Sequence, residues 1–149
     1  MVSDIQIILR LSLTVVLSGF IGLERQLHRR TAGLRTHILV SLGSCLIMLT
    51  SLYVFDIYNE KVGLDPVRMA AGVITGIGFL GAGAIIRAKE GVKGLTTAAS
   101  LWVVAGVGLA TGCGFYSGAM FATVLALIVL FFLRFLEIII FGRENRESP

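Results

Sequence analysis

The chain has 149 residues, of which 56% are hydrophobic and 15% are charged, and its formal net charge is +4. Soluble domains carry about 25% charged residues, so this composition excludes an ordinary soluble fold. The basic residues do not gather on a soluble element, which argues against nucleic acid as a partner. Apolar stretches of about 20 residues instead make the lipid bilayer the expected partner.

Five apolar segments follow one another along the chain, and each is expected to cross the bilayer as an α-helix. The predicted spans are residues 5–23, 34–55, 67–86, 95–111 and 116–136. The first span begins without a basic region or a cleavage site, so we interpret it as a retained helix rather than a signal peptide. The fold is therefore predicted to be all-α and polytopic, with a transmembrane domain over residues 1–141 and a cytoplasmic tail over residues 142–149.

Lysine and arginine residues set the predicted orientation, because they are enriched in the cytoplasmic loops of membrane proteins. Two loops are basic, with Arg25, Arg29 and Arg30 in the loop after the first span and Arg87, Lys89 and Lys93 in the loop after the third. On the other side, the two basic residues are offset by acidic ones. The N-terminus is therefore predicted to lie outside, and the basic loops and the C-terminus to lie in the cytoplasm.

The two predicted cytoplasmic hairpins resemble each other. Gly-Phe-Ile-Gly at 19–22 precedes Gly-Leu-Arg-Thr at 33–36, and Gly-Phe-Leu-Gly at 78–81 precedes Gly-Leu-Thr-Thr at 94–97. The order and direction are the same, so we interpret helices one and two and helices three and four as a parallel repeat about an axis along the membrane normal. This repeat would place the starts of the second and fourth spans side by side at the cytoplasmic face.

Charged and polar residues collect where these two helix starts are expected to meet. An unpaired carboxylate is costly at this depth, so Glu24 is expected to pair with Arg25 or Arg35. Thr36 and Thr97 are expected to help cap the two helix starts. The predicted functional cluster at the hairpins consists of Glu24, Arg25, Arg35, Thr36, His37, Thr96 and Thr97.

A glycine-dense segment in the third span contains a literal Gly-x-Gly-x-x-Gly sequence. Nucleotide binding is not expected, because a membrane span precedes it and no acidic residue follows at about 20 positions. The small residues of this span let another helix backbone approach, so helix packing is favoured over a break in the span. For the same reason, the third and fourth spans are expected in the middle of the bundle. Trp102 is expected to pack against the glycine face. The packing residues are Gly72, Gly76, Gly78, Gly81, Gly83 and Trp102.

The remaining polar residues favour ordinary structural roles. Arg10 is expected to extend its charged head toward the outer surface, and Cys45 and Cys113 are expected to act as small apolar residues without a disulfide. No carboxylate pair or activated nucleophile indicates an enzyme, and no cofactor is predicted. Mg²⁺ is bound through oxygen ligands such as carboxylates. Glu24 is the only candidate for such a ligand in this sequence, and it is a weak one.

Four ordered motifs resemble the N-terminal membrane domain of the MgtC/SapB family. They are GLERQ at 22–26, AGLRTHILVSLG at 32–43, GIGFLGAGAII at 76–86 and GLTTAASLW at 94–102. The resemblance implies a bacterial inner-membrane protein linked to growth in low Mg²⁺ and, in pathogens, to survival inside macrophages. It also implies a regulator of other membrane proteins, including the proton-translocating ATP synthase. We expect a shorter, SapB-type member without the soluble C-terminal domain of MgtC-like members, and Thr96 stands where MgtC has Asn.

Three functions remain open at this point. The first is non-enzymatic regulation of other membrane proteins, with homodimerisation also expected for a small bundle with glycine faces. The second is transport of Mg²⁺ or another solute through a site where the repeats meet. The third is binding of anionic lipid headgroups by the arginine-rich loops and helix starts. Mg²⁺ is not predicted as a cofactor; it would enter as a ligand or a signal in the first and third functions and as the transported species in the second.

Overall fold

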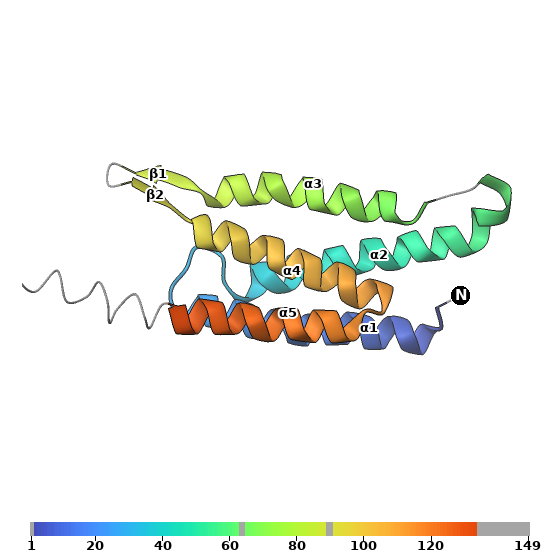
Figure 1. The fold of residues 1–149 in the computed structure, drawn as a ribbon, viewed down its shortest axis with the longest axis horizontal. Coiled ribbons are helices and arrows are strands. Elements are labelled where there is room, and N and C mark those ends of the chain that lie inside the picture. Colours follow the sequence, from blue (N-terminus) through green and yellow to red (C-terminus); the bar gives the residue numbers. More distant parts are fainter. Residues whose placement is uncertain (1, 63–64, 89–90, 134–149) are drawn as a thin grey trace, which may run out of the picture.

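The computed structural model describes residues 2–62, 65–88 and 91–133. These residues form five α-helices, a π-helix and a short β-hairpin (Figure 1). The helices are α1 (Asp4–Leu27), α2 (Leu34–Val62), α3 (Val67–Ala84), α4 (Leu95–Cys113) and α5 (Tyr116–Ile128), which continues as the π-helix Val129–Leu133. The strands β1 (Ile86–Ala88) and β2 (Gly91–Lys93) connect α3 to α4.

The predicted spans agree with the observed helices. Four helices, α1, α2, α3 and α4, are long and apolar enough to cross a membrane. The described part of the fifth span, Tyr116–Phe132, is a shorter apolar helix. The end of the fifth predicted span and the predicted tail lie outside the described residues. The all-α, polytopic membrane fold is therefore confirmed.

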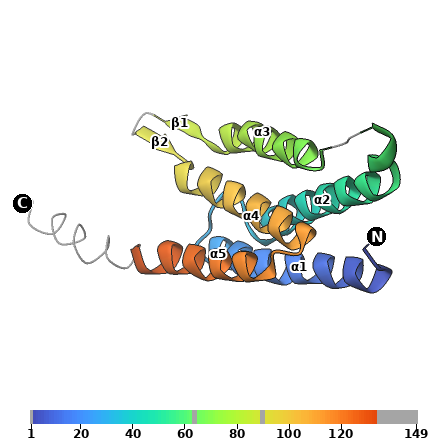
Figure 2. The ribbon, with the colours of Figure 1, turned by 45° about the vertical axis from the view of Figure 1, so that its right-hand side comes forward.

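The helices are arranged as a bundle with α2 and α4 in the centre. Figure 1 and Figure 2 show α3 on one side of this pair and α1 and α5 on the other. α4 contacts all four other α-helices, and half of its residues are buried. Only 6% of the α3 span is buried, so the expectation of a central position is right for α4 and wrong for α3. An apolar helix has no need to be buried in protein when lipid surrounds it.

The bundle has two distinct ends. We name one of them the arginine end, because its basic residues include Arg25, Arg29, Arg30, Arg35 and Arg87. It carries the α1–α2 loop, the β-hairpin and the start of α4 (Figure 1). The opposite end carries the N-terminus and the turn between α4 and α5, where Gly114 has a φ of 89°.

The charged segment after α3 is more ordered than the loop that the sequence predicted. It forms an antiparallel hairpin in which Ile86 pairs with Lys93 and Arg87 with Val92. α4 then begins after Gly94, whose φ is 94° and whose added Cβ would lie 2.0 Å from the Ala84 carbonyl oxygen. α3 itself is continuous to Ala84, so the alternative of a broken helix is wrong.

The core of the bundle is polar as well as apolar. Fully buried side chains include Ile21 and Val104, but also Thr14, Ser18 and Ser41, while many large hydrophobic side chains are exposed on the outside. Such an arrangement suits a bilayer, where helices associate through close packing and hydrogen bonds rather than through the hydrophobic effect.

Candidate functional site

Glu24 and Arg25 form a buried ion pair in the last turns of α1. Their side chains are 6% and 2% exposed. Arg25 Nη2 donates to Glu24 Oε1 at 2.8 Å, and Arg25 Nε donates to the other carboxylate oxygen. His28 Nδ1 also lies 2.9 Å from Glu24 Oε1. Pairing of Glu24 with Arg25 is thus confirmed, whereas Arg35 is exposed and is not the partner.

His37 links α2 to α4 beside this pair. It is fully buried, with Nδ1 2.8 Å from the Gly33 carbonyl oxygen and Nε2 3.0 Å from Ser100 Oγ. Neutral histidine has one N–H. If Nδ1–H donates to Gly33, then Nε2 accepts the Ser100 hydroxyl. His37 therefore makes a local contact with Gly33 and a second contact with Ser100 of α4, which spacing along one helix could not reveal.

Three helices converge at these residues. An added Cβ on Gly22 of α1 would lie 3.0 Å from His37 Cβ and 2.9 Å from Leu34 Cα, so the α1 and α2 backbones are in close contact. Glu24 and Arg25 are near enough to act electrostatically on His37. We name Glu24, Arg25, His28, His37 and Ser100 the polar cluster.

The other predicted hairpin residues lie around the polar cluster without joining it. Thr97 is buried, and its carbonyl oxygen lies 2.8 Å from Ser100 Oγ, where it competes with His37 Nε2 for the one hydroxyl hydrogen of Ser100. Thr36 and Thr96 are exposed. The expected cap of α4 by Thr97 is wrong, because Gly94 precedes α4 with no side-chain cap. At the start of α2, Leu34 N–H donates to Gln26 Oε1 at 3.1 Å, since the short loop brings α1 within reach.

The glycine face of α3 is open. An added Cβ on Gly72, Gly76, Gly78 or Gly83 would meet nothing within 4 Å, and on Gly81 it would meet only Ala98 Cβ at 3.7 Å. Trp102 is 56% exposed, so its expected packing against these glycines is wrong within this chain. α3 instead contacts its neighbours through Ile77 and Gly81, its buried residues.

A groove of about 710 Å³ lies between α2 and α3, and we name it the α2/α3 groove. From α2 it is lined by Leu39, Val40, Gly43, Ser44 and Ile47, and from α3 by Met69, Gly72, Val73, Gly76, Ile77 and Leu80. Its lining is almost entirely apolar. The groove therefore offers a surface to another apolar helix rather than to a polar solute.

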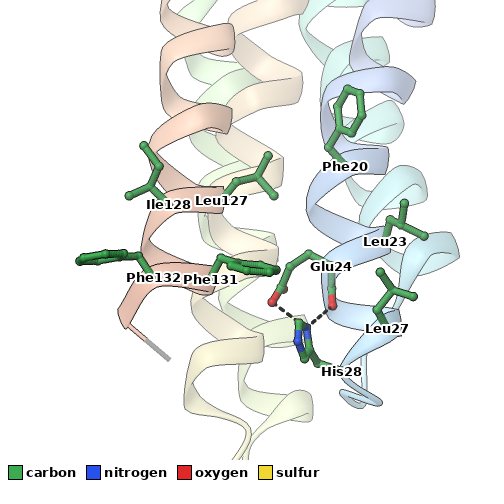
Figure 3. Close-up of a pocket in the computed structure, with 9 residues that line it drawn as sticks. All are labelled: Phe20, Leu23, Glu24, Leu27, His28, Leu127, Ile128, Phe131 and Phe132. Carbon is green, nitrogen blue, oxygen red and sulfur yellow. Dashed lines mark hydrogen bonds and ion pairs between the residues drawn. The ribbon is translucent and has the colours of Figure 1, made fainter. Parts of the chain in front are cut away.

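A second hollow, the α1/α5 cleft, lies beside the polar cluster and has a volume of about 740 Å³ (Figure 3). It is lined by Phe20, Leu23, Glu24, Leu27, His28, Leu127, Ile128, Phe131 and Phe132. Glu24 and His28 are its ionisable residues. The sequence interpretation missed both the cleft and His28, although the four-residue spacing from Glu24 places both side chains on one helix face.

Metal binding receives little support from this arrangement. Among the described residues, no group of three or more histidine, cysteine, aspartate and glutamate side chains could hold a metal ion. The Glu24 carboxylate already accepts hydrogen bonds from Arg25 and lies against His28. The polar cluster is suited to joining helices through hydrogen bonds.

Comparison with known proteins identifies the family. The MgtC family model matches residues 11–139. Identity is 46% over 127 residues to YhiD of Escherichia coli K12, 41% over 130 residues to SapB of Bacillus subtilis and 42% over 127 residues to MgtC of Salmonella typhimurium LT2.

These alignments cover 84%, 85% and 85% of the chain, but only 59%, 55% and 52% of the respective relatives. The chain thus spans little more than half the length of the curated relatives it matches. No solved structure matches it significantly. The chain belongs to the MgtC family and is a multi-pass protein of the bacterial inner membrane.

Proposed function

We propose that the chain is a non-enzymatic regulator of other membrane proteins, and that it holds a membrane-spanning helix of its partner in the α2/α3 groove. The observation that carries this proposal is the open face of α3. Gly72 and Gly76 line the groove at a four-residue spacing, and an added Cβ on either would meet nothing within 4 Å. Such a face lets a second helix backbone approach closely in a bilayer.

The similarity of the two hairpins supports this use of the groove. With the hairpins aligned on Gly19 and Gly78, Leu13 and Leu17 of α1 correspond to Gly72 and Gly76 of α3. Leu13 and Leu17 belong to the apolar cluster that holds Ala119 of α5 against α1 and α4. The α2/α3 groove is thus the counterpart of a surface that already binds a helix. Its expected occupant is an apolar helix that presents small residues.

Magnesium transport is the second function that an observation favours. One relative, YhiD, is named as a candidate magnesium transporter, and Glu24 is a buried carboxylate at one end of this bundle. Mg²⁺ is usually held by one or two carboxylates together with several waters. Since Arg25 and His28 already engage Glu24, helix docking is the better supported function.

Replacement of the groove glycines tests the proposal. Gly72→Leu and Gly76→Leu should each abolish the ability of the chain to restore growth in low Mg²⁺ to a host that lacks its own copy. The amount of protein in the membrane should stay unchanged, because both added side chains enter open space. The matched control is Gly106→Leu on α4, which also meets nothing within 4 Å and should restore growth normally.

Two outcomes would contradict the regulatory function. Full growth with both groove variants would show that the α2/α3 groove is not used. Mg²⁺ uptake into proteoliposomes that contain only this chain, lost in Glu24→Gln, would favour transport instead.

A further inference from the structure

The α1/α5 cleft has walls that match lipid chains. Figure 3 shows Phe20, Leu23 and Leu27 on α1 and, on the other side of the cleft, Leu127 and Phe131, with Phe131 pointing toward α1. Several of these side chains are more than half exposed, including Phe20 at 54% and Phe131 at 66%. The cleft is therefore open sideways, toward the acyl chains of the surrounding bilayer.

The cleft is shaped by the way α1 and α5 separate. The two helices are held together near Ala119, which is fully buried against Leu17. At the arginine end they meet again where the His28 ring contacts the Phe131 ring edge-on, with centroids 6.1 Å apart. The apolar walls of the cleft therefore lie between the helix contact at Ala119 and the ionisable side chain of His28.

Two basic residues, Arg29 and Arg30, follow His28 in the chain at this end of the cleft. The chain reverses immediately after His28, with Arg29 at a φ of 53°. Two backbone bonds of 3.0 Å close the turn, from Arg29 N–H to the Gln26 carbonyl and from Arg30 N–H to the Arg25 carbonyl. Both arginine side chains are exposed. Left-handed backbone is unfavourable for residues other than glycine, so the rest of the turn must hold Arg29 in place.

The formal charge around the cleft is positive. Glu24 lines the wall, but Arg25 pairs with its carboxylate. Arg29 and Arg30 therefore contribute two positive charges beyond this pair, and a protonated His28 adds a third. An occupant with apolar chains and an anionic head matches both the walls and the charge. A second helix would match the walls alone.

We propose that the α1/α5 cleft binds one anionic phospholipid. Its acyl chains lie on the walls formed by Phe20, Leu23 and Ile128, and its phosphate is bound by Arg29 and Arg30, with His28 beside it. This site lies on the opposite side of the bundle from the α2/α3 groove and is independent of the proposed regulatory function (Figure 1). It shares Arg29 and Arg30 with the arginine-rich loop that the sequence predicted to bind lipid, but it places the lipid in the α1/α5 cleft rather than at the paired helix starts.

Lipid retention measured by native mass spectrometry tests the proposal. The purified chain should retain phosphatidylglycerol in preference to phosphatidylcholine with the same acyl chains. A basic residue near an anionic surface contributes about fivefold to binding, so the double variant R29Q/R30Q should reduce retention of phosphatidylglycerol about thirtyfold. Arg68→Gln is the matched control, because Arg68 is an exposed arginine at the start of α3.

A second variant tests the walls. Leu127→Trp should fill the cleft and reduce retention of both lipids, whereas Leu46→Trp, on the exposed surface of α2, should not. Glycerol phosphate alone should fail to displace the bound lipid, because it lacks the chains. Equal retention of the two lipids would overturn the proposal, as would unchanged retention in R29Q/R30Q. Loss of a helical partner or of dimers in Leu127→Trp, with lipid retention unchanged, would assign the cleft to protein instead.

Discussion

Arg10 joins three helices at the end of the bundle opposite the arginine end. The sequence favoured a side chain that extends toward the surface, and this expectation is wrong, because Arg10 is only 9% exposed. Its Nη1 donates to the Gly112 carbonyl oxygen at 2.7 Å, and its Nε donates to Tyr116 Oη at 3.1 Å. Carbonyl groups in the last turn of a helix lack intrahelical partners and attract cations. Arg10 therefore stabilises the end of α4.

Removal of this charge should destabilise the protein. Arg10→Gln should lose the bond to the Gly112 carbonyl, at a cost of about 1–3 kcal/mol for a hydrogen bond to a charged donor. The melting temperature of the purified protein should fall by about 5 °C or more. Arg68→Gln, which removes an exposed arginine, should leave it unchanged. An unchanged melting temperature in Arg10→Gln would mean that the buried guanidinium makes no net contribution.

The interaction partners of single residues were predictable where the two residues are close in the sequence. Glu24 and Arg25 are neighbours, and the cost of an unpaired carboxylate in the membrane was enough to pair them. The partner of Arg10 lies 102 residues away, so no local pattern reveals it. Ser100 is likewise 63 residues from His37.

At the scale of the helices, glycines serve two different purposes. Four of the predicted packing glycines of α3, Gly72, Gly76, Gly78 and Gly83, face open space. The glycines that hold helices together within the chain include Gly22 on α1 and two glycines on α4. An added Cβ on Gly108 would lie 2.1 Å from the Ser41 carbonyl oxygen, and one on Gly112 would lie 2.7 Å from Met48 Cβ. The α2–α4 contact therefore requires glycine at both positions.

Gly108→Ala should disrupt the centre of the bundle. Its methyl group would collide with the backbone of Ser41, which cannot move without shifting α2, so we expect a loss of about 3 kcal/mol. The protein should unfold at lower temperature in detergent and accumulate less in the membrane. Gly106→Ala is the control, because this glycine meets nothing within 4 Å. Equal stability of the two variants would contradict the close α2–α4 contact.

Helix lengths were predictable from the sequence, but helix positions were not. A membrane span must be long and apolar, and this requirement leaves a strong signal. Lipid is as apolar as leucine, so an exposed apolar helix such as α3 has the same composition as a buried one. The short hairpin at Ile86–Ala88 and Gly91–Lys93 was missed, because three residues are too few to display an alternating pattern.

At the scale of the whole molecule, the observed contacts are compatible with the predicted repeat. α2 and α4 form the central pair, with α1 against α2 and α3 against α4. At matching positions, Gly22 approaches His37 and Gly81 approaches Ala98. The repeat and the orientation across the membrane both remain predictions.

The two native cysteines test the orientation. Cys113 is exposed at the end opposite the arginine end, and Cys45 is fully buried. If the N-terminus lies outside, an impermeant maleimide should label Cys113 in intact right-side-out spheroplasts. Cys113→Ser should abolish the labelling, and Cys45→Ser should leave it unchanged. Labelling that requires permeabilised membranes would reverse the orientation.

The hairpin that connects α3 to α4 fixes how the two helices meet. The strand β2 leads directly into Gly94, whose left-handed backbone sets the angle between the two helices. An added Cβ on Gly94 would lie 2.0 Å from the Ala84 carbonyl oxygen, so a side chain at this position would change that angle. Since α3 forms one wall of the α2/α3 groove, the width of the groove depends on the backbone of Gly94.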